Sequence, residues 1–197
     1  MSTDVVCLCD VCPDCINAES DGLWICYYDQ YRIAINALLA TECAERSILP
    51  LLNMVSTYIE LWVKVIGLNF GLGSDNAVTA EMFTGHKLSQ LIEKLRDSIR
   101  WEEYKQVEKD LIEVWDIVDY LAGLSAEEDI SLSEAMRYPQ TRRKNYSLNQ
   151  CLIAHLTELC DKFSVNNVLD AVKELMKKTY GIYDQIYEMR VLQNTIY

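Results

Sequence analysis

Apolar residues recur at steps of three and four along most of this chain, which is the spacing of one face of an α-helix. The pattern predicts a first helix over residues 28–46 and a second from Pro50 to Phe70. The second segment is apolar nearly all round, as expected of a central helix that neighbours cover on several sides. Proline suits a first helical turn, and the glycines at 67, 71 and 73 indicate where this helix ends.

The later part of the chain predicts further helices. Thr84 can cap one that carries leucines 88, 91 and 95, and a longer one follows Trp101 and stops at Gly123. Ser147 can cap another, and a last helix begins near Asn166, with a bend expected at glycine 181. A short helical piece is expected over residues 79–83, and only residues 23–27 suggest a strand. The predicted fold is all-α, a bundle of five to six helices.

The first 27 residues differ from the rest and predict a small cysteine-rich knuckle, followed by the helical bundle over residues 28–197. Cysteine thiolates are soft metal ligands, and several of them this close in sequence favour zinc, which four thiolates bind in a tetrahedron. Cys12 and Cys15 have the spacing of a metal-binding turn, and the expected strand would return Cys26, with Cys7 or Cys9 as the fourth ligand. The candidate metal ligands are therefore Cys7, Cys9, Cys12, Cys15 and Cys26.

Two other interpretations of the cysteine cluster remain open, reduced thiols without metal and a redox pair. A bound zinc ion would fold a segment too short to bury a core, and it would leave no open position for catalysis. The remaining cysteines, Cys43, Cys151 and Cys160, fall within helical patterns and are expected to be small buried apolar residues.

Charge and composition limit the classes of partner. The chain has 197 residues, 50% of them hydrophobic, and a formal charge of -12 from 30 acidic and 18 basic residues. This charge repels phosphate backbones at long range, so nucleic-acid contact is expected only locally. Polar residues interrupt every apolar stretch and the first residues do not resemble a signal peptide, which predicts a cytoplasmic protein without a membrane span. In that compartment its cysteines are expected to be thiols or metal ligands and not disulfides.

Two segments are candidate partner-binding surfaces. The polar stretch 124–147 carries Arg137, Arg142, Arg143 and Lys144, which can hold phosphate or an acidic partner or can simply be a solvated loop. The tyrosines at 180, 183, 187 and 197 have near-helical spacing at the end of the chain. They favour packing against a second copy or another protein, or closure of the chain's own bundle.

Three short segments resemble the HEPN families of small all-helical proteins. Residues 58–64 read Tyr-Ile-Glu-Leu-Trp-Val-Lys, residues 85–91 read Gly-His-Lys-Leu-Ser-Gln-Leu, and residues 136–139 read Met-Arg-Tyr-Pro. These match helices of the form E-L-x-x-K and G-H-x-L-x-x-L and a later R-Y-P. The resemblance covers roughly residues 28–190. It implies a helical bundle from families common in toxin pairs, defence islands and phage–host conflict, often as ribonucleases.

Active members of those families place an arginine shortly before a histidine. This chain has two histidines, and neither has an arginine at the required position. The positions that would need arginine are Thr79, Ala80 and Glu81 for His86, and Leu148, Asn149 and Gln150 for His155. Without the guanidinium, charge on a scissile phosphate is not stabilised in the way the family requires. The resemblance therefore implies no enzyme but an inhibitor or adaptor, with another protein or a nucleoprotein as its partner.

Two alternatives are kept. The first is a ribonuclease toxin with an unconventional site built on Arg137 and the basic loop. The second is an acidic inhibitor that mimics nucleic acid in the groove of a defence or CRISPR effector, a complex that salt would weaken.

Overall fold

The structure is a computed structural model that describes residues 20–70, 88–98, 105–124 and 164–195. This part of the chain holds five α-helices, one 3₁₀ turn and no strand. The helices are α1 (Ser20–Leu39), α2 (Ile48–Phe70), α3 (Leu88–Ser98), α4 (Lys105–Ala122) and α7 (Val165–Thr195), and the 3₁₀ turn is η2 (Glu45–Ser47). The prediction of an all-α bundle is confirmed for these residues.

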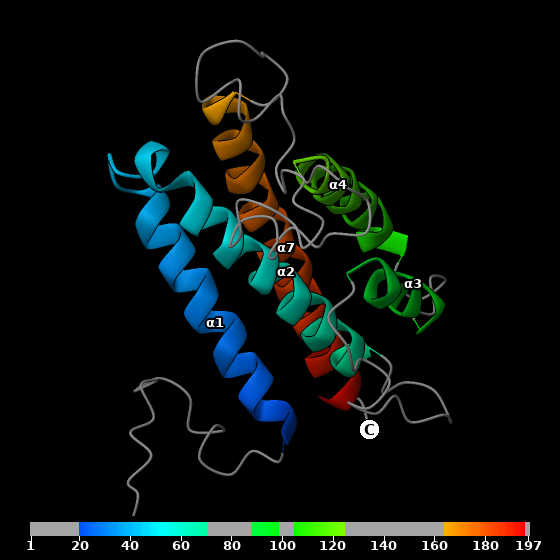
Figure 1. Cartoon of the computed structure of the whole chain (residues 1–197). Coiled ribbons are helices and arrows are strands. Elements are labelled where there is room, and N and C mark those ends of the chain that lie inside the picture. Colours follow the sequence, from blue (N-terminus) through cyan, green and yellow to red (C-terminus); the bar gives the residue numbers. More distant parts are fainter. Residues whose placement is uncertain (1–19, 71–87, 99–104, 125–163, 196–197) are drawn as a thin grey trace, which may run out of the picture.

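Helix α2 lies at the centre of the bundle, as its all-round apolar pattern predicted. It packs against α1, α3 and α7, and α4 packs mainly against α7 (Figure 1). The 3₁₀ turn η2 connects α1 to α2 after a short turn at residues 40–44. The 31 residues of α7 make it about 46 Å long at 1.5 Å per residue, so it reaches along both α1 and α4.

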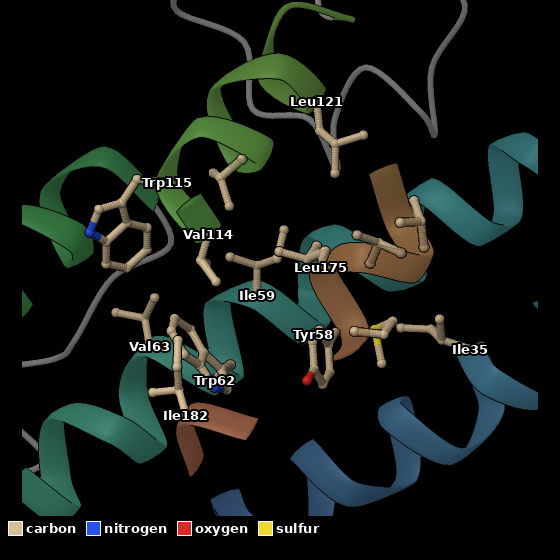
Figure 2. Packing of buried hydrophobic residues seen from close by; sticks show 14 of the residues in the cluster. Ile35, Tyr58, Ile59, Trp62, Val63, Val114, Trp115, Leu121, Leu175 and Ile182 are labelled. Atoms are coloured by element: carbon tan, nitrogen blue, oxygen red, sulfur yellow. The ribbon is translucent and has the colours of Figure 1, made fainter. Parts of the chain in front are cut away.

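A single hydrophobic core joins all the described α-helices (Figure 2). Trp62 of α2 and Trp115 of α4 meet edge to face, with ring centroids 5.9 Å apart. Ile59 and Val63 of α2 and Leu175 of α7 belong to the same buried cluster. Burying these large aromatic side chains stabilises the fold, because each removes a large apolar area from water.

Two helix boundaries follow from the sequence, whereas the first helix ends at Leu39 and not near residue 46 as expected. Helix α2 begins two residues before Pro50, and proline is tolerated in this first turn because its missing N–H would have no partner there. Helix α4 ends at Ala122, and the N–H of Gly123 donates to the carbonyl of Asp119 at 3.1 Å. The expected stop at Gly123 is confirmed.

The last helix begins with a cap that the sequence pattern left unassigned. The Ser164 hydroxyl accepts a hydrogen bond from the N–H of Asn167 at 3.0 Å, which satisfies one of the free donors of the first turn. The helix then runs through Gly181 without interruption. A Cβ at that position would meet no atom within 4 Å, so no close approach requires glycine there.

The expected strand over residues 23–27 is wrong, because these residues belong to α1. The knuckle boundary at residue 27 therefore falls inside a continuous helix, and only residues 1–19 of the expected knuckle lie outside the described chain. Buried Tyr28 and partly buried Ile25 explain the difference. They lie three residues apart, so both face the core from the first turns of α1. Asp29, expected at a helix start, lies mid-helix and pairs with Arg32.

The two described cysteines also differ from expectation. Cys26 is disulfide-bonded, whereas it was expected to be a thiol or a metal ligand. A zinc site that includes Cys26 would first need this bond reduced, because the ligand is a thiolate. Cys43 is a free and exposed thiol in the turn after α1, and not the buried apolar residue expected of a helix interior.

One described segment, Glu45–Gly67, is long and apolar enough to cross a membrane by length and composition alone. Inside the bundle 56% of its apolar window is buried, which is typical of the core helix of a folded domain. The environment of this segment is therefore accounted for by α1, α3 and α7 packing around it.

Candidate functional site

Most residues that the sequence put forward as sites lie outside the described chain. These are the metal candidates Cys7, Cys9, Cys12 and Cys15, both histidines, and the basic residues Arg137, Arg142, Arg143 and Lys144. Among the residues that the structure describes, no group of three or more His, Cys, Asp or Glu side chains could hold a metal ion. The zinc prediction thus stays a prediction.

The described segment of the family resemblance is residues 58–64 of α2. Tyr58 and Trp62 are fully buried, and the Lys64 ammonium contacts the Glu60 carboxylate at 2.6 Å, one turn away. Lys64 is nearly buried as well, so this pair keeps a charged side chain compensated beside the core. In this structure the Glu-x-x-x-Lys spacing thus has a packing role.

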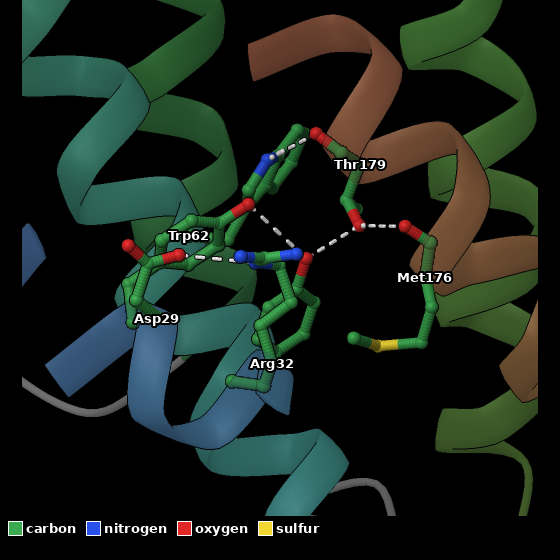
Figure 3. Close-up of polar contacts among 7 residues, drawn as sticks. Asp29, Arg32, Trp62, Met176 and Thr179 are labelled. Atoms are coloured by element: carbon green, nitrogen blue, oxygen red, sulfur yellow. Dashed lines mark hydrogen bonds and ion pairs between the residues drawn. The ribbon is translucent and has the colours of Figure 1, made fainter. Parts of the chain in front are cut away.

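Behind this segment a buried polar cluster joins α1, α2 and α7 (Figure 3). The Trp62 indole N–H donates to the Thr179 carbonyl at 3.1 Å, and the Tyr58 hydroxyl lies 2.7 Å from the Thr179 hydroxyl. Thr179 has one hydroxyl proton, and the Leu175 carbonyl lies 2.7 Å from that hydroxyl. Tyr58 is therefore the donor to Thr179, and the cluster fixes how α2 and α7 align.

The phenols in this cluster are not suited to acid–base chemistry. Burial raises the pKa of Tyr28 and of Tyr58, and the charge of the neighbouring phenol adds to the increase at Tyr28. Their hydroxyls are 3.4 Å apart and their rings stack at 5.2 Å. Tyr183 of α7 packs on Tyr28 at 5.5 Å. The cluster is a neutral structural element, because desolvation disfavours the phenolate form.

A groove on the outer side of the same helices is the strongest candidate for function. It has a volume of about 390 Å³ and lies between the second half of α1 and the first half of α7. Its charged lining residues are Arg32, Lys173 and Lys177, and no acidic residue of the described chain lines it. We call this site the basic groove. It stands out because the chain as a whole carries a charge of -12.

Arg32 is held in place at one end of the basic groove. Its Nε donates to Asp29 at 3.0 Å, and its guanidinium lies 5.0 Å from the centre of the Tyr180 ring. Partial burial opposes its charge, but the hydrogen bond and charge of Asp29 outweigh this effect and raise the pKa of Arg32. Arg32 is therefore a positive group held by Asp29, with its side chain partly exposed at the groove.

The two lysines are more exposed than Arg32, and among the described residues they pair only within their own helix. Lys173 contacts Asp170 at 3.2 Å and Lys177 contacts Glu174 at 3.9 Å, each three residues away. Pairs of this kind contribute only about 0.2–0.5 kcal/mol. A ligand carboxylate can replace either one at little cost.

Exposed tyrosines continue this face along α7. Tyr180 is 47% exposed and Tyr187 is 59% exposed, whereas Tyr183 between them is half-buried against Tyr28. Residues seven apart share one face of a helix, so Tyr180 and Tyr187 lie on the same side as the lysines of the basic groove. Of the four tyrosines expected at an interface, Tyr183 packs in the bundle, Tyr180 and Tyr187 are exposed, and Tyr197 lies outside the described residues.

The side of α7 that faces α4 carries a different charge arrangement. The Lys178 ammonium contacts the carboxylates of Glu113 and Asp110 on α4 and of Glu174 on its own helix. The hydrogen bond from Lys178 lowers the pKa of Glu113, and the same bond raises the pKa of Lys178. Here a lysine is surrounded by acids and joins two helices, so this site is structural.

Comparison with known proteins identified no relative of this chain. The chain matches no family model, no curated protein and no solved structure. The resemblance to the HEPN families therefore remains an expectation drawn from three short segments, of which one lies in the described residues.

Sequence reasoning did not find the basic groove. The available signal was the run of lysines at 173, 177 and 178, which concentrates basic charge within two turns of an acidic chain. Arg32 is about 140 residues away in sequence, and no local pattern connects it to those lysines. Only the packing of α1 on α7 brings the three cations together.

Proposed function

We propose that this chain is a non-catalytic binding protein that engages another protein through the outer face of α1 and α7. The observation that supports the proposal is the coincidence of the basic groove with the exposed rings of Tyr180 and Tyr187. Tyrosine is enriched at protein interfaces because it couples an apolar ring to a polar tip. An exposed aromatic and cationic face on a well-packed bundle favours binding over chemistry.

The role in phage–host conflict, as inhibitor or adaptor, comes from the family resemblance and forms part of the same proposal. Its two alternatives predict different behaviour. An unconventional ribonuclease would cleave RNA and lose activity on changing Arg137 or His86. A nucleic-acid mimic would bind a basic groove of its target through acidic residues, and the α1–α7 face would be dispensable.

Site-specific photocrosslinking tests where the partner binds. The full-length chain carries a benzophenone amino acid in place of Tyr187 or, in a matched control, in place of Ile112, which is similarly exposed on α4. After irradiation in the cells that express it, we expect one defined adduct from position 187 and none from position 112. Equal adducts from both positions, or none from position 187, would contradict the proposal. An adduct of twice 22.7 kDa would identify a second copy as the partner.

A further inference from the structure

The basic groove has a chemical character that identifies what part of a partner it takes. Its three charged side chains come from two helices, and all are cationic. The acids that pair with them, Asp29, Asp170 and Glu174, do not line the groove. The groove is therefore lined by cationic side chains, and the carboxylates that pair with them lie outside its lining.

The rest of the lining is apolar or neutral. Leu39 of α1, Ala40 directly after it and Met176 of α7 line it, with Asn36 as a neutral donor and acceptor and Tyr180 near Arg32. Methionine adapts its shape to irregular ligands because its side chain is unbranched and polarisable. A ligand with carboxylates next to one apolar side chain matches this combination.

The geometry of Arg32 strengthens the match. Asp29 accepts a hydrogen bond from Nε of the guanidinium, and the cation–π contact with the Tyr180 ring also restrains the guanidinium group. The terminal nitrogens can then bind a carboxylate without first ordering the arginine, which lowers the entropic cost of binding. A lysine at this position would have no planar guanidinium group and could not stack on the Tyr180 ring in the same way.

We propose that the basic groove binds a short acidic segment of the partner protein, with a carboxylate on Arg32, further carboxylates on Lys173 and Lys177, and an apolar side chain against Leu39. This inference rests on the proposed function, since it names the chemistry of the partner at the same face. Charge complementarity carries it, because three cations meet in one site of a chain whose net charge is -12.

Size and charge favour a peptide over nucleic acid. A site of about 390 Å³ holds a few side chains, whereas a nucleic-acid strand continues beyond it with a phosphate at every step. Those further phosphates would meet the acidic surface of the chain. A peptide can place its carboxylates in the groove alone.

Fluorescence anisotropy with the full-length protein tests the inference. The probe is a labelled peptide Glu-Leu-Glu-Glu-Leu-Glu, compared with its Gln-Leu-Gln-Gln-Leu-Gln counterpart and with a single-stranded oligonucleotide. We expect the acidic peptide to bind, its affinity to fall as salt rises from 50 to 300 mM, and the glutamine peptide to bind at least about fivefold more weakly. Binding of the oligonucleotide in preference to the peptide, lost in groove variants, would overturn the inference.

Variants assign the binding to the groove. K173Q together with K177Q removes two cations, and K105Q together with K109Q removes two exposed cations at the same spacing on α4. We expect the first pair to weaken the peptide by about fivefold or more and the control pair to change it by less than about twofold. R32K should also weaken it, despite keeping the charge. Equal effects of the two lysine pairs would overturn the inference.

The two experiments separate this inference from the proposed function. If a defined adduct forms from position 187 and persists in K173Q/K177Q, while the acidic peptide does not bind, the binding face stands and the acidic segment is excluded. If no adduct forms from position 187, the proposed function itself fails.

Discussion

Helix α7 presents two faces that differ in almost every respect. Toward α2 it places Thr179, Leu175 and Ile182, all fully buried, and its polar groups there have partners on another helix. Toward the basic groove it places Lys173 and Lys177, which are exposed and, within the described part of the chain, pair only with acids of their own helix. The contrast indicates that the first face determines the fold and that the second is left available for a ligand.

The energetics of the two faces differ for one physical reason. A buried donor or acceptor that loses its partner cannot turn to water, so its loss costs free energy. An exposed ion pair exchanges its partner for water or for a ligand group at little cost. Changes on the inner face should therefore alter stability, and changes on the groove face should alter binding.

The largest expected effect follows from removing the central tryptophan. Trp62→Ala should lower the free energy of unfolding by about 3–5 kcal/mol, because it leaves a cavity against Trp115 and removes the donor to the Thr179 carbonyl. Guanidinium denaturation followed by circular dichroism measures it. Tyr187→Ala is the matched outer change and should cost under about 0.5 kcal/mol. Similar costs for the two would break the distinction between the faces.

A smaller effect is expected from the hydroxyl that joins α2 and α7. Thr179→Val keeps the shape but leaves the buried Tyr58 hydroxyl without its 2.7 Å partner, and should cost about 1–3 kcal/mol. In Tyr58→Phe/Thr179→Val both hydroxyls are gone, so the double variant should lose less stability than the sum of the single variants. Urea denaturation of the four proteins measures this coupling. Strict additivity would show that the hydrogen bond does not fix the alignment of the helices.

The groove face should tolerate neutralisation. Lys173→Gln/Lys177→Gln should change the free energy of unfolding by no more than about 0.5 kcal/mol, because each lysine pairs only with an exposed acid three residues away. Thermal unfolding at moderate salt measures it, in the same preparations used for peptide binding. A destabilisation comparable to that of Thr179→Val would mean that the groove is part of the fold and not a free site.

The smallest expected effect concerns the ion cluster between α4 and α7. The hydrogen bond from Lys178 lowers the pKa of Glu113 below its ordinary 4.5, so this carboxylate contributes stability above that pH. The contribution is lost as pH falls through the lowered pKa. For Lys178, whose pKa is raised above 10.5, the contribution is present below that pH and is lost as pH rises through the raised pKa.

Glu113→Gln should therefore make stability less dependent on pH on the acid side, below about pH 4.5. Thermal unfolding between pH 3 and pH 6 measures the slope, and Glu108→Gln, an exposed change on the same helix, provides the control. An unchanged slope in Glu113→Gln would exclude a stabilising link between α4 and α7 at Lys178.

Much of the fold could be predicted from local pattern alone. The stop at Gly123 and the buried leucines of α3 follow from helical spacing, because an amphipathic helix needs only its own apolar stripe to be recognised. The beginning of α1 could not be predicted in the same way. Residues 23–27 are rich in aromatic and apolar side chains that suit a strand, and the packing of Ile25 and Tyr28 with the core favours a helix.

The sequence by itself determined that this chain forms helices, that the apolar segment from Pro50 to Phe70 lies at the centre, and that the molecule is strongly acidic. These are local or additive properties, set by periodicity and by charge count. Only the tertiary structure decided that Arg32 meets Lys173 and Lys177 in one groove, and that the Tyr58 hydroxyl donates a hydrogen bond to Thr179. Those contacts join residues over 100 positions apart, and their partners are chosen by the crossing of packed helices, which no local pattern encodes.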